Sequence, residues 1–215
     1  QTVDQRYGNT DCAAYNDFRE VCRRSDIDAV CIATPDHWHV LVSLEAARNN
    51  KDMYTEKALG LSLAWDKALQ QACHTYGRVF QWGTQQRSDR NFRFGCELVR
   101  NGRIGKLHTI QVGVPYDFAF PNQPTQPVPE GLDYDLWLGP APWAPYTYQR
   151  CRPWTEKESY SIWYHISDYC LGGIGGYWGV HHVDIAQWGH GTDGTGPVEI
   201  EGTGMFPADG LTDCA

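Results

Sequence analysis

The sequence has no concentrated positive charge and no long apolar run. Its 215 residues contain 18 Lys and Arg against 26 Asp and Glu, which gives a formal net charge of −8. The lack of a basic cluster argues against a nucleic-acid partner, because binding to the phosphate backbone depends on such clusters. No stretch approaches the roughly 20 apolar residues that a membrane-spanning helix needs, so we expect no membrane span.

The chain also lacks a C-x-x-C pair, although it contains eight cysteines. Cys31 falls in an apolar strand pattern and Cys96 in a helix pattern, where a thiol behaves as a small hydrophobic side chain. We therefore expect mostly free thiols. The cysteines do not decide the compartment, and a cytoplasmic and an exported or periplasmic location both stay open.

Aromatic residues, by contrast, are abundant: the chain has nine Trp and twelve Tyr. Many crowd the second half, at Trp137, Trp143, Tyr146, Tyr148, Trp154, Trp163 and Tyr164. Aromatic rings stack on sugar faces while offering a polar edge, so one interpretation is a carbohydrate ligand. A Trp-rich core or a subunit interface uses the same property and is equally compatible with the pattern.

Strand and helix patterns alternate three times in the first half of the chain. Three short runs have the composition of buried strands: 26–35, 52–60 and 78–86. A run with helical spacing follows each of them: 36–51, 62–77 and 91–105. In the second helix, Ser62 is a suitable N-cap and Gly77 stands just past the end. The alternation predicts a partial doubly wound parallel sheet of the α/β class.

The pattern changes after Gly105. Residues 106–116 alternate like a half-buried strand, and 198–206 is another strand candidate. A long segment rich in Pro, Trp and Tyr lies between them and shows few periodic signals. We therefore place a domain boundary near residue 103, which divides the chain into residues 1–102 and 103–215.

Polar residues follow the carboxyl ends of the three predicted strands, at Thr34-Pro35, Glu56-Lys57 and 85–87. In open α/β sheets, ligands bind at that edge. A lysine held there beside a glutamate can polarise a carbonyl or hydroxyl oxygen. A single Glu-Lys pair is more often a surface pair, but three strand-end loops together favour a binding site.

Two adjacent histidines mark a further helix, predicted from Val180 onward. His181 and Asp184 are three positions apart and share a face of this helix, whereas His182 lies on another face. These side chains could be metal ligands, proton-transfer groups or polar residues at a helix start. A metal site would also require the histidines of 36–39, which only the fold could bring close.

Five segments in order resemble the glucose–fructose oxidoreductase and inositol dehydrogenase (Gfo/Idh/MocA) family: DAVCIATPDHWH, YTEKALG, RNGRIGKLHTIQVG, LDYDLWLGPAPWAPY and GVHHVDIAQWG. The resemblance implies a partial, Rossmann-like dinucleotide-binding domain over 1–102. It implies an incomplete α+β domain for substrate and oligomerisation over 103–215, with a largely antiparallel open sheet. It also implies a homo-oligomer when complete.

The function implied by the resemblance is hydride transfer between a nicotinamide cofactor, NAD or NADP, and a sugar, polyol or glycoside. NAD-assisted glycoside cleavage is an alternative within the enzyme class. A non-catalytic carbohydrate-binding or oligomer-forming remnant is the alternative from another class. No metal is required, because the hydride goes to the nicotinamide and the hydroxyl proton to a base.

The resemblance also assigns roles to individual residues. Lys57 and His181 would be catalytic, with Tyr177 assisting. The residues lining the cofactor would be Thr34, Pro35, His39, Glu56, Lys57 and Gln85. The residues on the substrate side would be Arg87, Trp163, His182 and Asp184.

The chain departs from the family at three points. Ala58 replaces the proline of the Glu-Lys-Pro signature, and Tyr177 replaces the aspartate of Asp-x-x-x-His. A phenol has a pKa near 10 and stays neutral at pH 7, so it supplies no negative charge to Lys57 or His181. A pyrophosphate-binding G-x-G-x-x-G loop is also absent from residues 1–102. We therefore expect a chain truncated at both ends, with weak or no NAD binding.

Overall fold

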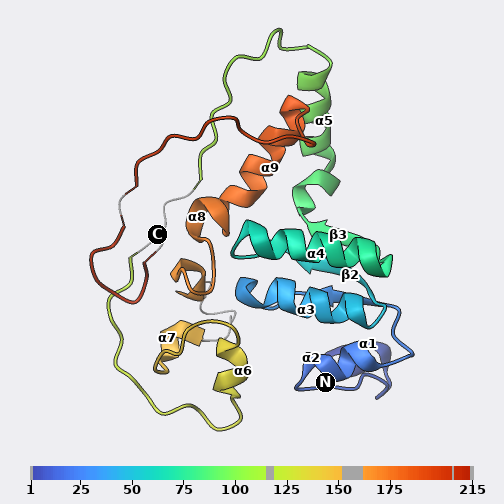
Figure 1. Ribbon diagram of the computed structural model, residues 1–215, viewed down its shortest axis with the longest axis vertical. Coiled ribbons are helices and arrows are strands. Elements are labelled where there is room, and N and C mark those ends of the chain that lie inside the picture. Colours follow the sequence, from blue (N-terminus) through green and yellow to red (C-terminus); the bar gives the residue numbers. More distant parts are fainter. Residues whose placement is uncertain (1, 115–118, 152–161, 205, 214–215) are drawn as a thin grey trace.

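The computed structural model describes residues 2–114, 119–151, 162–204 and 206–213. Its elements in chain order are α1 (Thr2–Tyr7), α2 (Phe18–Arg23), β1 (Ala29–Ile32), α3 (Asp36–Arg48), β2 (Asp52–Glu56), α4 (Leu63–Tyr76), β3 (Phe80–Gly83), the 3-10 turn η1 (Gln85–Ser88), α5 (Arg90–Arg100), α6 (Tyr134–Leu138), α7 (Tyr148–Cys151), the 3-10 turn η2 (Ile162–His165), α8 (Gly172–Gly175) and α9 (Gly179–His190) (Figure 1).

The three strands form a parallel sheet in the order β1-β2-β3. The register places Thr55 of β2 opposite Ile32 of β1 and Trp82 of β3. Helices α3 and α4 lie side by side along one face of this sheet (Figure 1). This arrangement confirms the predicted Rossmann-like alternation of strands and helices, and it brings the carboxyl ends of all three strands to one edge.

A first core lies between this sheet and its helices. Its buried members are Cys22, Ile32, Val40, Val42, Ala46, Ala47, Met53 and Leu69. Small alanines on α3 allow the helix to approach the sheet closely. At the same interface, the fully buried hydroxyls of Ser43 and Thr55 lie 2.9 Å apart and satisfy each other. Helix α3 is therefore fixed on β2 by packing and by a paired polar contact.

Helix α4 begins and ends as its sequence predicts. The Ser62 side chain accepts a hydrogen bond from the backbone N–H of Trp65. Gly77 adopts a left-handed conformation with φ of 61° and closes the helix. A residue with a Cβ atom would be strained at that position.

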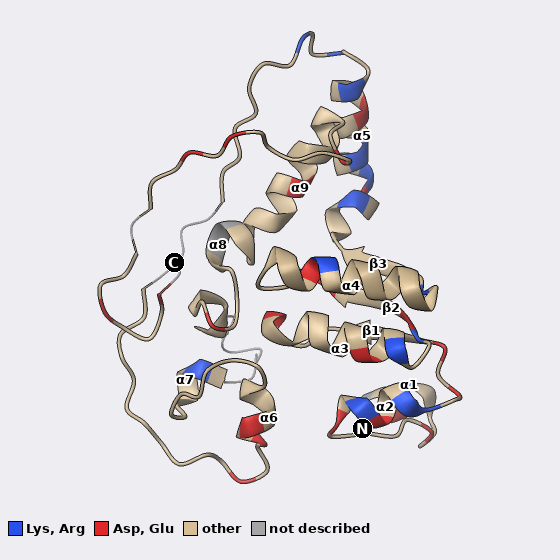
Figure 2. Ribbon diagram, viewed as in Figure 1, with Lys and Arg blue, Asp and Glu red and all other residues tan. Residues whose placement is uncertain are grey.

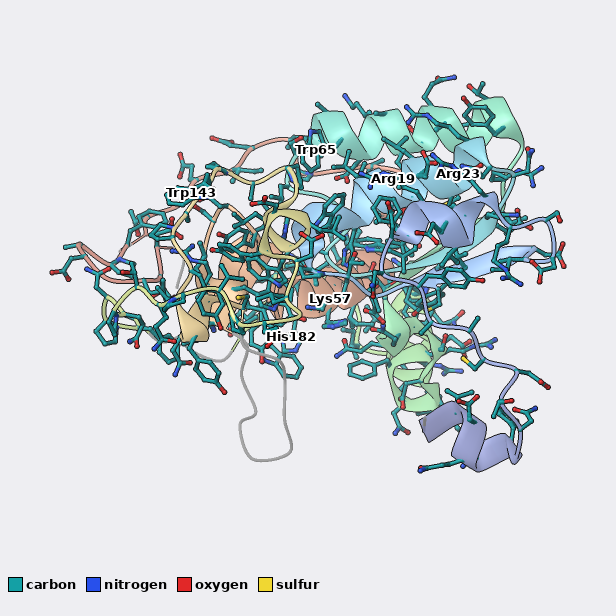
Figure 3. The ribbon with its side chains drawn as sticks, turned by 90° about the horizontal axis from the view of Figure 1, so that it is seen from below. Arg19, Arg23, Lys57, Trp65, Trp143 and His182 are labelled. Atoms are coloured by element: carbon teal, nitrogen blue, oxygen red, sulfur yellow. The ribbon has the colours of Figure 1, made fainter. Side chains whose placement is uncertain are left out.

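A second core contains several of the aromatic residues described in the second half. Its buried members are Tyr134, Leu138, Tyr146, Ile162, Trp163, Ile166, Tyr169, Cys170 and Leu211. Four other aromatic residues of this half are exposed instead: Trp143, Tyr148, Trp178 and Phe206. Trp143 lies apart from Lys57 in Figure 3. Trp154 is outside the described residues. For the buried members, the structure favours a Trp- and Tyr-rich core over an open sugar-binding platform.

Two predicted strands of the second half do not form. Residues 106–114 and 198–204 have no strand pairing, and the described chain contains only the parallel sheet. Their alternating sequence was therefore not sufficient, because a strand needs a neighbour that pairs with its backbone N–H and C=O groups. The largely antiparallel open sheet is accordingly not seen in the described residues, although the mixed α/β class is correct.

The cysteines and charges give further checks. Seven cysteines are described, and all seven are free thiols. Cys96 is buried as expected, but Cys31 is exposed, because successive side chains of a strand point to opposite faces and the next residue, Ile32, is the one that faces the core. Acidic and basic residues are interspersed along the helices (Figure 2). Among the helices of the described chain, none has the length and apolarity to cross a membrane.

Candidate active site

The three strand-end loops are connected by hydrogen bonds. His39, fully buried on α3, places its Nε2 2.7 Å from the Thr34 carbonyl oxygen and its Nδ1 against that of Ala58. Gln85 Nε2 donates to Glu56 Oε1 at 2.6 Å. The loops after β1, β2 and β3 thus form one continuous surface, as their positions in the sequence predict.

Lys57 extends from this edge toward the segment that precedes α9. Its Nζ donates to the carbonyl oxygens of Gly176 and Tyr177, at 3.0 and 3.2 Å. It also lies over two aromatic rings, 5.1 Å from the centre of Tyr164 and 5.4 Å from that of Tyr177. Among the described residues, no carboxylate lies within 4 Å of this ammonium. Carbonyl dipoles and ring faces therefore fix its position.

His181 is half-buried in the first turns of α9. Burial lowers the pKa of its imidazole, and the positive charge of Lys57 lowers it further. Its Nδ1 is buried with no hydrogen-bond partner in the described chain. The imidazole is consequently neutral at pH 7, which is the form that can accept a proton.

Tyr177 presents its ring, rather than an acidic group, to this site. The ring lies 5.1 Å from that of Tyr164, so the two phenyl faces flank Lys57 together. The Tyr177 backbone carbonyl is the group that accepts from Lys57. The tyrosine therefore stabilises the ammonium without a formal negative charge.

Two residues predicted for the substrate side bind each other. Arg87 Nε and Nη2 donate to the two carboxylate oxygens of Asp184, at 2.7 and 2.8 Å. Arg87 Nη2 also donates to Asp193 at 2.8 Å, and the guanidinium lies 5.4 Å from the ring centre of Trp188. This cluster joins η1 to α9, so it holds the His181 helix against the sheet domain.

The other two predicted substrate-side residues contact different parts of the chain. His182 Nδ1 is 2.7 Å from the carbonyl oxygen of Gly113. Trp163 is buried and stacks on Tyr164 with ring centres 3.8 Å apart. Trp163 thus supports the ring that covers Lys57. Figure 3 shows Lys57 and His182 in the same central region of the molecule.

Breaking the Arg87 cluster should destabilise the protein. Hydrogen bonds to charged groups contribute about 1.5–3 kcal/mol each, and the Asp184 side chain is only 11% exposed. With partial exposure of Arg87 taken into account, we expect Arg87→Met to lower the free energy of unfolding in urea by about 2 kcal/mol. Arg93→Met is the matched control, because the Arg93–Glu97 pair is exposed on both sides. Equal losses in the two variants would contradict this account.

The sequence did not predict a place beside Lys57 for Asp36, Tyr164 or Cys170, although Tyr164 belongs to the aromatic set of the second half. Asp36 begins α3 immediately after Thr34-Pro35, and its position in a strand-end loop was a usable signal. It is 1% exposed, and burial raises the pKa of its carboxyl to about 7. Tyr164 and Cys170 carry no such signal, because only the tertiary fold brings them to Lys57 and Asp36.

The residues at the sheet edge suit the nicotinamide end of a dinucleotide. The Thr34 hydroxyl is buried at the end of β1 without a hydrogen-bond partner in the described chain, and so is His181 Nδ1. Two orphaned polar atoms are thus available near the loops that meet at Lys57. Among the described residues, no group of three His, Cys, Asp or Glu side chains is placed so that it could hold a metal ion.

Family profiles match both halves of the chain. Residues 2–84 match the NAD-binding Rossmann fold of the Gfo/Idh/MocA oxidoreductases, and residues 98–206 match their C-terminal alpha/beta domain. The chain belongs to the Gfo/Idh/MocA oxidoreductase family. The resemblance seen in its motifs is thereby confirmed.

Named relatives cover parts of the chain. It is similar to myo-inositol 2-dehydrogenase of Thermotoga maritima (29% identity, 56% of this chain, 33% of the relative). It is also similar to scyllo-inositol 2-dehydrogenase (NAD(+)) of Bacillus subtilis (36% identity, 40% of this chain, 25% of the relative). A crystal structure of a "probable dehydrogenase" from Thermotoga maritima shares the fold over 88% of this chain and 44% of its own, with 23% identity and a TM-score of 0.55. The chain spans about a third or less of the length of the curated relatives it matches.

Proposed function

We propose that this chain contributes to a nicotinamide-dependent oxidoreductase that interconverts a hydroxyl and a carbonyl on a polyol or sugar. The observation that carries the proposal is the pairing of Lys57 and His181. A fixed ammonium at the carboxyl edge of a Rossmann-type sheet lies close enough to a neutral, half-buried imidazole to lower its pKa. Two inositol dehydrogenases among the similar proteins support the substrate class.

The two residues would divide the work on a substrate hydroxyl. An ammonium has three N–H donors, and two of those on Lys57 are directed at carbonyl oxygens. The third can donate to the substrate oxygen and stabilise negative charge that develops on it. His181 would accept the hydroxyl proton, and its lowered pKa keeps it unprotonated until it does so.

Thr34, Pro35, His39, Glu56 and Gln85 would line the nicotinamide end of the cofactor. When bound, the nicotinamide accepts the hydride that leaves the substrate carbon. Choice between NAD and NADP belongs to the adenosine end. The G-x-G-x-x-G string at 189–194 lies at the end of α9 rather than between a strand and a helix, so it does not have the context of a pyrophosphate-binding loop. Weak cofactor binding by this chain alone therefore stays a prediction, as do the homo-oligomer and the domain boundary near residue 103.

Deuterium transfer tests the proposal directly. The protein is incubated with NAD or NADP and a panel of inositols, hexoses and methyl glycosides that carry deuterium on the reacting carbon. We expect deuterium on the nicotinamide ring for at least one inositol or sugar, detected by mass spectrometry. A panel with no label in the cofactor, at millimolar cofactor and with the protein shown to be folded, would contradict the proposed function.

A further inference from the structure

We infer that Asp36 is the buried charge partner of Lys57, a positioning residue that supplies the negative charge which Tyr177 does not. The role in turnover rests on the proposed function, whereas the charge coupling itself does not. The inference rests on the positions of four residues that surround one point at the sheet edge: Asp36, Cys170, Gly176 and Lys57.

The topology brings Asp36 and Lys57 together. They follow β1 and β2, which are parallel neighbours paired through Ile32 and Thr55. Asp36 is the first residue of α3, so its carboxylate lies at the positive end of the helix dipole. One turn later, His39 contacts the Ala58 carbonyl and fixes α3 to the loop that carries Lys57.

A chain of contacts closes around the two residues. The Cys170 thiol and the Ala58 backbone amide lie close enough to the Asp36 carboxylate to lower its pKa. Cys170 Sγ also lies against Gly176, where an added Cβ atom would come within 2.4 Å of it. The Gly176 carbonyl in turn accepts from Lys57 Nζ at 3.0 Å. Asp36 and Lys57 are thus joined on two sides, through Ala58 and through Cys170.

The electrostatics agree with this geometry. Neither carboxylate oxygen of Asp36 has a hydrogen bond of ordinary geometry in the described chain. Burial raises the pKa of Asp36 to about 7, while Lys57, Cys170 and the Ala58 amide lower it and Glu56 raises it. Tyr164, whose ring covers Lys57, has its pKa raised by burial and by the charge of Asp36.

The pair should therefore be sensitive to pH near neutrality. Above pH 7 the Asp36 carboxyl is ionised and the site holds a charge pair. Below it, the carboxyl is neutral and Lys57 is held by carbonyl oxygens and ring faces alone. An ammonium near a carboxylate favours the charged form of the carboxylate. Loss of Lys57 should therefore alter the titration of Asp36, and loss of Asp36 should alter the chemical reactivity of Lys57.

The first test is the titration of Asp36 by ¹³C NMR of aspartate-labelled protein without cofactor. Asp36→Asn identifies its signal. We expect a midpoint near 7 in the unmodified protein and a rise of about one pH unit in Lys57→Met, equal to a tenfold change in proton affinity. The Asp66 signal should not move, because burial alone raises the pKa of that carboxyl. An unchanged Asp36 midpoint in folded Lys57→Met would overturn the inference.

The reverse test does not need a Lys57 variant. Acylation of Lys57 by an amine-reactive ester, followed by peptide mass spectrometry, should be about threefold to tenfold faster in Asp36→Asn, as expected when one nearby charge is removed. Asp66→Asn is the matched control and should leave the rate unchanged. Equal rates in Asp36→Asn and the unmodified protein would also overturn the inference.

Measurements of turnover distinguish the proposed oxidoreductase function from the inferred Asp36–Lys57 charge pair. In a protein that passes the deuterium test, Asp36→Asn should lower kcat more than it raises KM. Tyr177→Asp should raise kcat by a larger factor in the Asp36→Asn background than in the unmodified protein. A merely structural role for Asp36 would give the same factor in both backgrounds, and equal factors count against the inference. If the NMR coupling is present but no deuterium transfer occurs, the proposed function fails and the charge pair stands.

Discussion

Replacing Lys57 with Met is expected to abolish most turnover while leaving a folded protein. Side chains that donate a hydrogen bond to charge developing in the transition state, or that transfer a proton, typically raise the rate about a hundredfold to ten-thousandfold. We expect kcat to fall by a factor in this range. Methionine keeps the length and apolar stem that pack between the Tyr164 and Tyr177 rings. The variant removes the positive charge and the hydrogen bonds to Gly176 and Tyr177.

Lys51 provides an unusually close control. It precedes β2, whereas Lys57 follows the same strand, and its Nζ also donates to two backbone carbonyls, those of Arg24 and Ile27. Lys51→Met should therefore cost stability in urea but leave turnover per folded molecule unchanged. Steady-state kinetics and unfolding curves for both variants check this. If the two variants lose turnover equally, the loss at Lys57 is structural and its catalytic role is wrong.

The two histidines at the start of α9 should differ in the same assay. His181→Gln is expected to lose turnover on the scale of Lys57→Met, because the imidazole is the proposed base. His182→Gln should lose little, since its Nδ1 faces the Gly113 carbonyl rather than Lys57. Equal losses would instead indicate that both rings serve one function, and a metal assay would then decide whether they share an ion.

The sheet domain could be predicted because its signals are local. Helix spacing, the Ser62 N-cap and the Gly77 C-cap specify α4 without reference to the rest of the chain. The parallel alternation then places three loops at one edge, so Lys57 could be assigned to a site from sequence position alone. The helix of His181 was found for the same reason, with Asp184 one turn further on the same face.

The surroundings of Lys57 could not be predicted, because they come from distant parts of the chain. Gly176 lies 119 positions after Lys57 and contributes only a backbone carbonyl, which leaves no trace in side-chain pattern. Arg87 and Asp184 were assigned to substrate, yet each satisfies the other in the described structure. Residues 106–114 alternate like a strand but have no pairing partner in the described chain, so alternation alone was misleading there.

Variants of Tyr177 should reveal which group accepts the proton. Lys57 lies 5.4 Å from the centre of the Tyr177 ring, and cation–π contacts of this kind contribute about 0.5–2 kcal/mol. Tyr177→Phe keeps both the ring face and the backbone carbonyl that accepts from Lys57, so we expect little change in turnover. Tyr177→Leu removes the ring face and should lose more. We therefore expect kcat to be higher in Tyr177→Phe than in Tyr177→Leu, when the two variants are compared under conditions in which both are folded.

Tyr177→Asp should act in the opposite direction. Burial and the charge of Lys57 lower the pKa of His181, and a carboxylate at position 177 would offset the effect of Lys57. The imidazolium formed when His181 accepts the proton would be favoured by about tenfold for each unit of pKa recovered. Turnover measured above pH 7, where both His181 and Asp36 have lost their protons, should therefore rise in this variant. The opposite pattern, in which Tyr177→Phe folds and binds substrate but does not turn over, would show that the phenol rather than His181 transfers the proton.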